Sequence, residues 1–138
     1  MEWKTKQISH EGLPLMLRYP ENLDFNLFKS RFMKLVVLRH QFSKVTSNGL
    51  PEADYNESLF QFDQKIRDAF DLSQHGVTVL VETFAGKRNY YFYASTKENV
   101  AEIVGNLGRL FPQESLSWTI HSDPEWGFIS KYSKEFLQ

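Results

Sequence analysis

The sequence contains no cysteine among its 138 residues and no long hydrophobic run. Without thiols, disulfide frameworks, zinc–cysteine sites, iron–sulfur clusters and cysteine nucleophiles are all excluded. The apolar stretches are only a few residues long, which is too short to span a bilayer. Residues 1–6 lead into no apolar run and do not resemble a signal peptide. We therefore expect a cytoplasmic protein with no membrane segment.

The charged residues show no excess of one sign. Lys and Arg total 16, Asp and Glu total 17, and the net charge is −1. A protein that binds the nucleic-acid backbone usually carries a clear positive excess, because it must replace condensed counterions. The charge balance therefore argues against nucleic acid as a general partner.

The chain is well supplied with apolar and aromatic side chains. Hydrophobic residues make up 41% of it and aromatic residues 15%, which is too much for a disordered chain. A chain of this length buries roughly two-thirds of the surface that its unfolded form exposes. We expect one domain over residues 1–138, with a core that needs no metal.

Hydrophobic periodicity divides the chain into strands and helices. Alternation with a period of two, bounded by turn residues, predicts strands at Trp3–Ile8, Gly12–Tyr19, Phe32–Phe42, Val77–Phe84, Arg88–Ala94 and Leu116–His121. Spacings of three and four predict helices at Ala53–Ser73, after the capping-box sequence Ser95-Thr96-Lys97-Glu98 as far as Pro112, and from Asp123-Pro124 onward.

Three local features refine these elements. Pro14 lacks an N–H and favours an edge position for its strand. Gly76 suits the left-handed position that ends a helix. Asp123 and Pro124 are typical of an N-cap followed by the first helical residue.

The order strand, helix, strand, strand, helix, strand predicts an α+β fold with a ferredoxin-like core and an antiparallel sheet. We expect this core over about residues 31–121. A β-hairpin over residues 1–20 precedes it, and a C-terminal helix over about residues 124–137 follows it.

Three short motifs occur in a recognisable order: Asn48-Gly49-Leu50-Pro51, Gly86-Lys87-Arg88-Asn89-Tyr90-Tyr91-Phe92-Tyr93 and Asp123-Pro124-Glu125-Trp126. In order and spacing the chain resembles the bacterial family called domain of unknown function 695, from Trp3 to about Tyr132. That family is similar to regulators of the ribonuclease E inhibitor B type, which act by binding an enzyme. The resemblance implies a non-catalytic role with a protein partner. Where an acidic pair is expected in the first helix, this chain has Phe62-Asp63.

The residues give no catalytic motif and no cofactor-binding motif. The serines and glycines form no nucleophile elbow, phosphate loop or dinucleotide fingerprint. The four histidines form no metal-binding pair, and His40, on a strand face with Val36 and Leu38, is expected to be hydrogen-bonded and half-buried. No catalytic, metal or cofactor residue is assigned.

A partner-binding patch is the leading site hypothesis. Trp, Tyr and Arg are enriched at the energetic centres of protein interfaces. The candidates are Arg88, Tyr91, Tyr93, Asp123 and Trp126.

Two alternatives remain open. The first is a ligand site or enzyme that uses carboxylates such as Asp63, Asp123 or Glu125 with His121, although helix capping also accounts for Asp123. The second is single-stranded RNA binding, with Arg88, Tyr90 and Phe92 on an exposed sheet face. A regulatory or adaptor module that binds a protein is the function that we favour.

Overall fold

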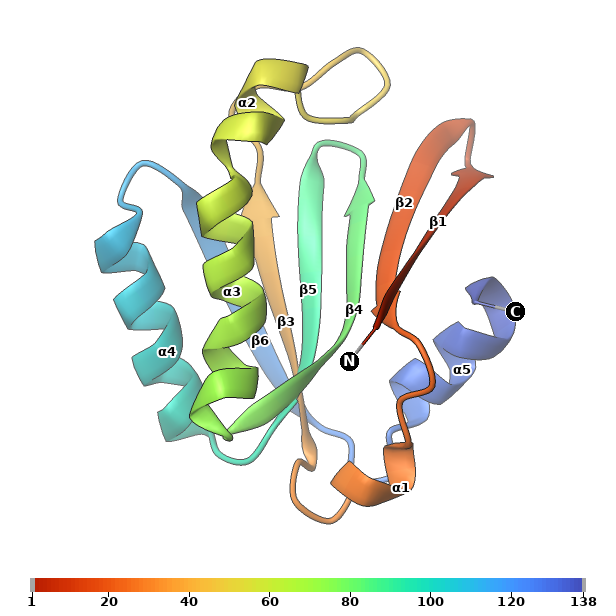
Figure 1. Cartoon of the computed structure of the whole chain (residues 1–138), viewed down its shortest axis with the longest axis vertical. Coiled ribbons are helices and arrows are strands. Elements are labelled where there is room, and N and C mark those ends of the chain that lie inside the picture. The colour runs from red at the N-terminus through yellow and green to blue at the C-terminus, as the bar shows by residue number, and fades with distance from the viewer. Residues whose placement is uncertain (1, 138) are drawn as a thin grey trace.

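The computed structural model describes residues 2–137, apart from the side chain of Leu72. Within these residues, one antiparallel sheet has the strand order β1-β2-β4-β5-β3-β6, and five helices accompany it (Figure 1). The strands are β1 Trp3–His10, β2 Leu13–Pro20, β3 Lys34–Gln41, β4 Gly76–Phe84, β5 Lys87–Ala94 and β6 Ser115–Ser122. The helices are α1 Phe25–Phe28, α2 Ala53–Ser58, α3 Phe60–Ser73, α4 Lys97–Leu110 and α5 Gly127–Phe136. The predicted α+β class and antiparallel sheet are confirmed.

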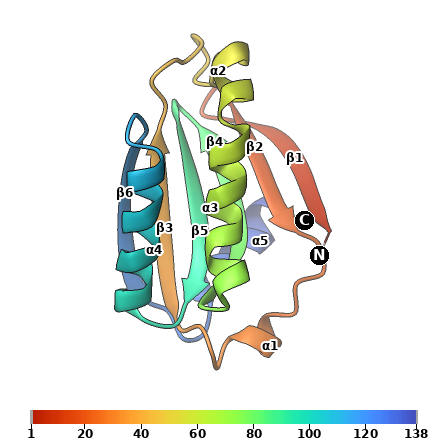
Figure 2. The ribbon, with the colours of Figure 1, turned by 60° about the vertical axis from the view of Figure 1, so that its left-hand side comes forward.

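Helices cover both faces of the sheet. The α3 and α4 helices lie on one face, and α5 lies on the other beside the β1–β2 hairpin (Figures 1 and 2). On β5, Tyr90 and Phe92 enter the core under α3, whereas Tyr91 and Tyr93 enter the core under α5. This explains why β5 is apolar on both faces, as is typical of a central strand. Within residues 2–137, no helix has the length and apolar character needed to cross a membrane.

The N-terminal hairpin extends the sheet beyond β4. The strands β1 and β2 pair along their whole length, but β2 pairs with β4 only over Met16–Arg18. The prediction that Pro14 marks an edge strand is wrong, because β2 has neighbours on both sides and β1 is the edge. Pro14 is tolerated because it lies in the part of β2 that pairs with β1 alone.

Two predicted helix features differ in the structure. The helix expected at Ala53–Ser73 is two helices, α2 and α3, with Leu59 between them. The left-handed residue after α3 is Gln74, not Gly76, which is the first residue of β4. Gly76 is required there for a different reason, because a Cβ at this position would lie 2.6 Å from the Tyr93 carbonyl oxygen.

The caps of the last two helices also differ from the prediction. Thr96, rather than Ser95, is the N-cap of α4, and its hydroxyl accepts from the Asn99 backbone N–H. The α5 helix begins at Gly127, because Pro124 and Glu125 form a turn. The short helix α1 lies in a segment for which periodicity predicted no element.

The Asn48-Gly49-Leu50-Pro51 loop packs on the tip of the β4–β5 hairpin. The Gly86 N–H donates to the Gly49 carbonyl at 2.8 Å. Gly49 has a φ of +84°, and a Cβ there would lie 2.8 Å from the Ala85 Cα. Both the backbone conformation and the close approach therefore require glycine.

We expect Gly49→Ala to lower the free energy of unfolding by more than the matched Gly12→Ala variant. Gly12 has nearly the same φ, +81°, but a Cβ there meets nothing within 4 Å. Gly12→Ala should cost about 1–2 kcal/mol through the left-handed backbone alone. Gly49→Ala should cost more, because its Cβ would also clash with the Ala85 Cα. Urea unfolding measures the difference in unfolding free energy between the two variants. Equal losses for the two variants would contradict this account of the loop.

Candidate binding groove

A groove of about 680 Å³ lies between the β1–β2 hairpin and the α2–α3 helix pair. Its lining comes from four strands, both helices and the loop before α2. We call it the arginine groove, and it is lined by Thr5, Met16, Leu17, Arg18, Leu50, Pro51, Asn56, Glu57, Leu59, Phe60, Asp63, Thr83 and Arg88.

Asp63, in the first turn of α3, is the centre of a polar network at the floor of this groove. Its Oδ1 accepts from Arg18 Nη2 at 2.8 Å and from the Tyr90 hydroxyl at 2.5 Å. Its Oδ2 accepts from Arg18 Nη1 at 3.0 Å and from Arg67 Nε at 3.2 Å. The guanidinium of Arg88 lies 3.5 Å from Oδ1. The network joins β2 and β5 to the start of α3.

The charge state of this network follows from its contacts. Burial alone would raise the pKa of Asp63, but the hydrogen bonds and charge of Arg18, helped by Tyr90 and Arg88, bring it to about 2. Burial raises the pKa of Tyr90, and the Asp63 carboxylate raises it further. At neutral pH the site therefore holds a carboxylate and a neutral phenol that donates to it.

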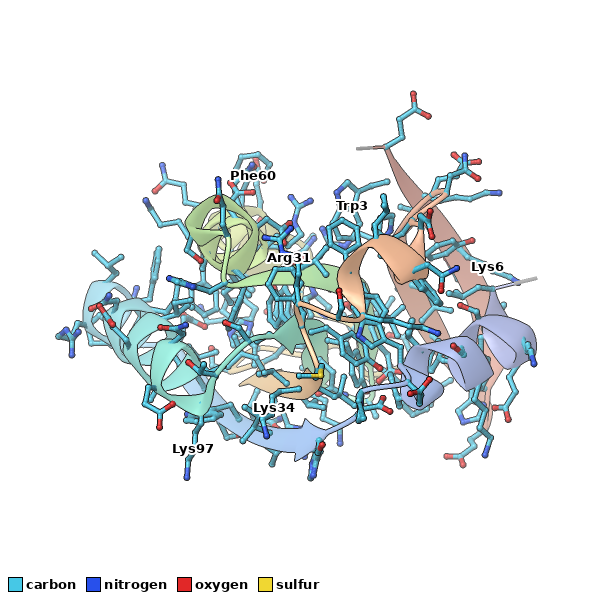
Figure 3. The ribbon with its side chains drawn as sticks, turned by 90° about the horizontal axis from the view of Figure 1, so that it is seen from below. Trp3, Lys6, Arg31, Lys34, Phe60 and Lys97 are labelled. Carbon is cyan, nitrogen blue, oxygen red and sulfur yellow. The ribbon has the colours of Figure 1, made fainter. Side chains whose placement is uncertain are left out.

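Apolar side chains line part of the arginine groove, beside the exposed polar residues Thr5, Asn56 and Glu57. Phe60 is 69% exposed, the highest fraction among the exposed large hydrophobic residues, and it points away from the sheet (Figure 3). Leu50 and Pro51 belong to the loop that packs on the β4–β5 hairpin and line the same groove. An exposed aromatic beside a charged floor is typical of a recognition surface rather than of a folded core.

Three of the predicted site residues do converge, but inside the molecule. Trp126 is fully buried and stacks on Tyr93 with 4.1 Å between the ring centroids. Its Nε1–H donates to the Phe32 carbonyl at 2.7 Å. The Tyr93 hydroxyl donates to Asp123 Oδ2 at 2.7 Å. These contacts fasten the start of α5 to the sheet.

The other two predicted residues lie on opposite faces of β5. Arg88 faces the arginine groove. Tyr91 is 8% exposed and donates to Glu82 Oε1 at 3.1 Å, on the side of α5. Tyr91, Tyr93 and Trp126 are buried, so they do not form an exposed patch with Arg88. Arg88 alone of the five remains at a candidate binding surface.

Asp123 has a structural role that accounts for all its contacts. Its carboxylate accepts from the backbone N–H groups of Gly127 and Phe128 at 3.0 and 3.1 Å, and from Tyr93. Burial opposes ionisation, but these hydrogen bonds outweigh it and lower the pKa of Asp123. No group of three metal-ligating side chains occurs within residues 2–137, and His121, Asp123 and Glu125 form none.

The residues expected to stack on RNA bases are not accessible. Tyr90 and Phe92 are both fully buried, and Phe92 packs on Phe70 of α3 at 4.2 Å between ring centroids. His40 is fully buried, and its Nε2 lies 2.8 Å from Glu114 Oε1. Burial lowers the pKa of His40 in spite of this carboxylate. These groups belong to the core.

A second hollow of about 570 Å³ lies between α3 and α4. Its apolar lining consists of Ala69, Ile103, Leu107 and the exposed Leu110, and the other lining residues are polar or charged. Its titratable residues form no salt bridge within the described part of the chain. It therefore lacks the charged cluster that distinguishes the arginine groove.

The Arg18–Asp63–Tyr90 network could not be read from the sequence as a site. Asp63 is 45 residues from Arg18 and 27 residues from Tyr90 in the sequence, and only the fold brings the three together. A weak signal was present, because Asp63 stands beside Phe62 and near Ile66 on the apolar stripe of its helix. Arg18 likewise interrupts an otherwise apolar strand. A charge in such a position needs a partner from elsewhere in the fold.

Comparison with known proteins gives the family of this chain. The model of the Family of unknown function (DUF695) matches residues 2–133.

The chain belongs to this family.

The predicted family is therefore confirmed over nearly the whole sequence. No curated protein and no solved structure matches the chain. All three DUF695-like motifs of the sequence have structural roles: a loop built on Gly49, the central strand β5, and the turn that precedes α5.

Proposed function

We propose that this DUF695 protein is a non-catalytic binding module that docks an extended segment of a protein partner in the arginine groove. The observation that carries the proposal is the combination of an ordered charged floor with the exposed side chain of Phe60 at the rim. Arginine and aromatic residues in such a setting supply the binding energy at many protein interfaces.

Binding is favoured over catalysis by the state of the groove's ionisable groups. Asp63, the carboxylate at the floor, accepts hydrogen bonds from Arg18, Arg67 and Tyr90 and has a pKa of about 2. A general base needs a pKa near the working pH and access to a substrate proton. Asp63 has neither, so its role is to hold the arginines in place.

The proposal also includes three predictions from the sequence, which concern the fold type, the cellular location and the regulatory role. It treats β3 to β6 with α3 and α4 as a ferredoxin-like unit, which their strand order β4-β5-β3-β6 supports. It places the protein in the bacterial cytoplasm. It also takes the similarity to regulators of the ribonuclease E inhibitor B type as a guide to a regulatory or adaptor role.

Site-specific photo-crosslinking in native cells tests the proposal. A photo-reactive phenylalanine analogue is placed at Phe60 in one variant and at Leu27 in the control. Leu27 is 67% exposed and lies on α1 at the opposite end of the molecule (Figure 1).

We expect an adduct with one protein from position 60 that is absent from position 27. Its crosslinked peptide should map to one segment of that protein, and Phe60→Glu should abolish its binding to the purified chain. The absence of any adduct at position 60, or the same adducts at both positions, would overturn the proposal.

A further inference from the structure

The buried cluster around Asp63, at the floor of the arginine groove, holds more positive charge than its one carboxylate balances, although the exposed Glu57 also lines the groove. Arg18, Arg67 and Arg88 all lie within salt-bridge distance of Asp63. Among residues 2–137, no second carboxylate lies within that distance of any of the three. Three largely buried guanidinium groups therefore surround one carboxylate, and two of them, those of Arg18 and Arg88, line the groove.

Asp63 forms a salt bridge with Arg88 but accepts its hydrogen bonds from other residues. Its two oxygens already accept four hydrogen bonds, from Arg18, Arg67 and Tyr90. The nearest atom of Arg88, Nη1, stays 3.5 Å from Oδ1, which is beyond ordinary hydrogen-bond length. Within the described residues, Arg88 therefore lies beside the Asp63 carboxylate but donates no hydrogen bond to a carboxylate.

Other residues hold the Arg88 guanidinium in a fixed orientation. Nε donates to the Thr83 hydroxyl at 2.8 Å, and Nη2 donates to the Asn56 side chain at 3.3 Å. The guanidinium also lies over the Phe42 ring, 5.3 Å from its centroid. An arginine fixed in this way loses little freedom when a planar anion binds its remaining donors.

We propose that Arg88 binds a carboxylate side chain of an acidic, extended segment of the partner, with Arg18 adding charge beside it. This inference rests on the proposed function, because it specifies what the partner places in the same groove. A peptide source fits the site because Leu50, Pro51 and Phe60 line the groove with apolar surface, which a lone inorganic anion would leave unused. A volume of about 680 Å³ also suits several residues rather than a single ion.

Glu57 provides a sensitive test of this electrostatic model. It is exposed, lines the same groove and makes no salt bridge within the described residues. Its charge opposes an incoming carboxylate, so its removal should strengthen binding without disturbing the fold. Glu98→Gln, on the exposed side of α4, makes the same chemical change far from the groove.

The experiment titrates the whole chain with three probes and follows the arginine Nε–Hε signals by NMR. The probes are a capped hexapeptide of alternating leucine and glutamate, its leucine–glutamine counterpart, and inorganic phosphate. We expect the glutamate peptide to bind about tenfold more tightly than the glutamine peptide and to shift the Arg88 signal. Glu57→Gln should tighten binding several-fold, Glu98→Gln should leave it unchanged, and Arg88→Gln should weaken it about tenfold.

Equal affinity for the two peptides would overturn the inference, because charge would then play no part. Phosphate binding as tight as that of the glutamate peptide would also overturn it, since the groove would then be a site for a small anion. An effect of Arg88→Gln without any effect of Glu57→Gln would mean that Arg88 acts only through the fold. The crosslinking result at Phe60 is independent of these outcomes, so partner docking and carboxylate recognition can fail separately.

Discussion

Replacing Asp63 by asparagine will lower the free energy of unfolding by about 3–5 kcal/mol, the usual cost of removing one partner from a buried ion pair. The Asp63 side chain is 11% exposed, and those of Arg18 and Arg88 are 28% and 11% exposed. Asparagine keeps one acceptor oxygen but removes the negative charge that, among residues 2–137, is the only one within salt-bridge distance of these cations. It also presents an NH₂ group to the guanidiniums that surround the site.

Urea unfolding followed by circular dichroism measures the loss. The matched control is Asp54→Asn, which makes the same chemical change at an exposed position in the first turn of α2. That variant should lose less than about 1 kcal/mol, through the helix dipole alone. Similar unfolding midpoints for the two variants would show that the Asp63 network contributes little to stability.

The lowered pKa of Asp63 also predicts how the stability of the fold changes in acid. The pKa of Asp63 is lowered from 3.8 to about 2 in the folded chain, so the unfolded chain takes up its proton first as the pH falls. This contribution, about 2 kcal/mol, is present above pH 4 and is lost as the pH falls towards 2. The difference in stability between the wild type and Asp63→Asn should therefore narrow over this range. A constant difference would contradict the ionised state of Asp63.

Local patterns predicted the positions of most strands because each depends on residues that are close in sequence. The alternation in Leu116–His121 and the turn at Ala85–Gly86 are local signals, and both elements are present. Errors arose where tertiary contacts decide the outcome. Thr96 rather than Ser95 caps α4, because the Ser95 hydroxyl donates to the His75 carbonyl 20 residues away.

Tyr91, Tyr93 and Trp126, which the sequence suggested for a partner-binding patch, are buried for a related physical reason. Tyr93 and Trp126 are of the residue types that are enriched at interface hot spots, but large aromatic side chains are also common in protein cores. Sequence alone gives no measure of burial, and α5 folds back over these rings. Arg88 was recognised from its residue type, whereas its position beside Asp63 and Arg18 depends on the pairing of β5 with β4 and of β4 with β2.

Replacing Trp126 by alanine will lower the free energy of unfolding by about 3–5 kcal/mol. The indole is fully buried, stacks on Tyr93 at 4.1 Å and lies 5.4 Å from the Phe25 ring. Its removal leaves a large cavity beneath α5 and deprives the buried Phe32 carbonyl of its donor. Trp118→Ala is the matched control. Trp118 is only partly buried on β6, so its truncation should cost clearly less.

The backbone at Trp126 allows the structural cause to be separated from a general loss of packing. Trp126 has a φ of +56°, in the left-handed region that non-glycine residues adopt at a cost. Glycine normally destabilises a chain relative to alanine. At this position, however, the free energy of unfolding of Trp126→Gly should exceed that of Trp126→Ala by about 1 kcal/mol. Urea unfolding should therefore rank wild type above Trp126→Gly, and Trp126→Gly above Trp126→Ala. If alanine proves more stable than glycine, the residue does not hold the left-handed turn by which Asp123 and Trp126 lead the chain into α5.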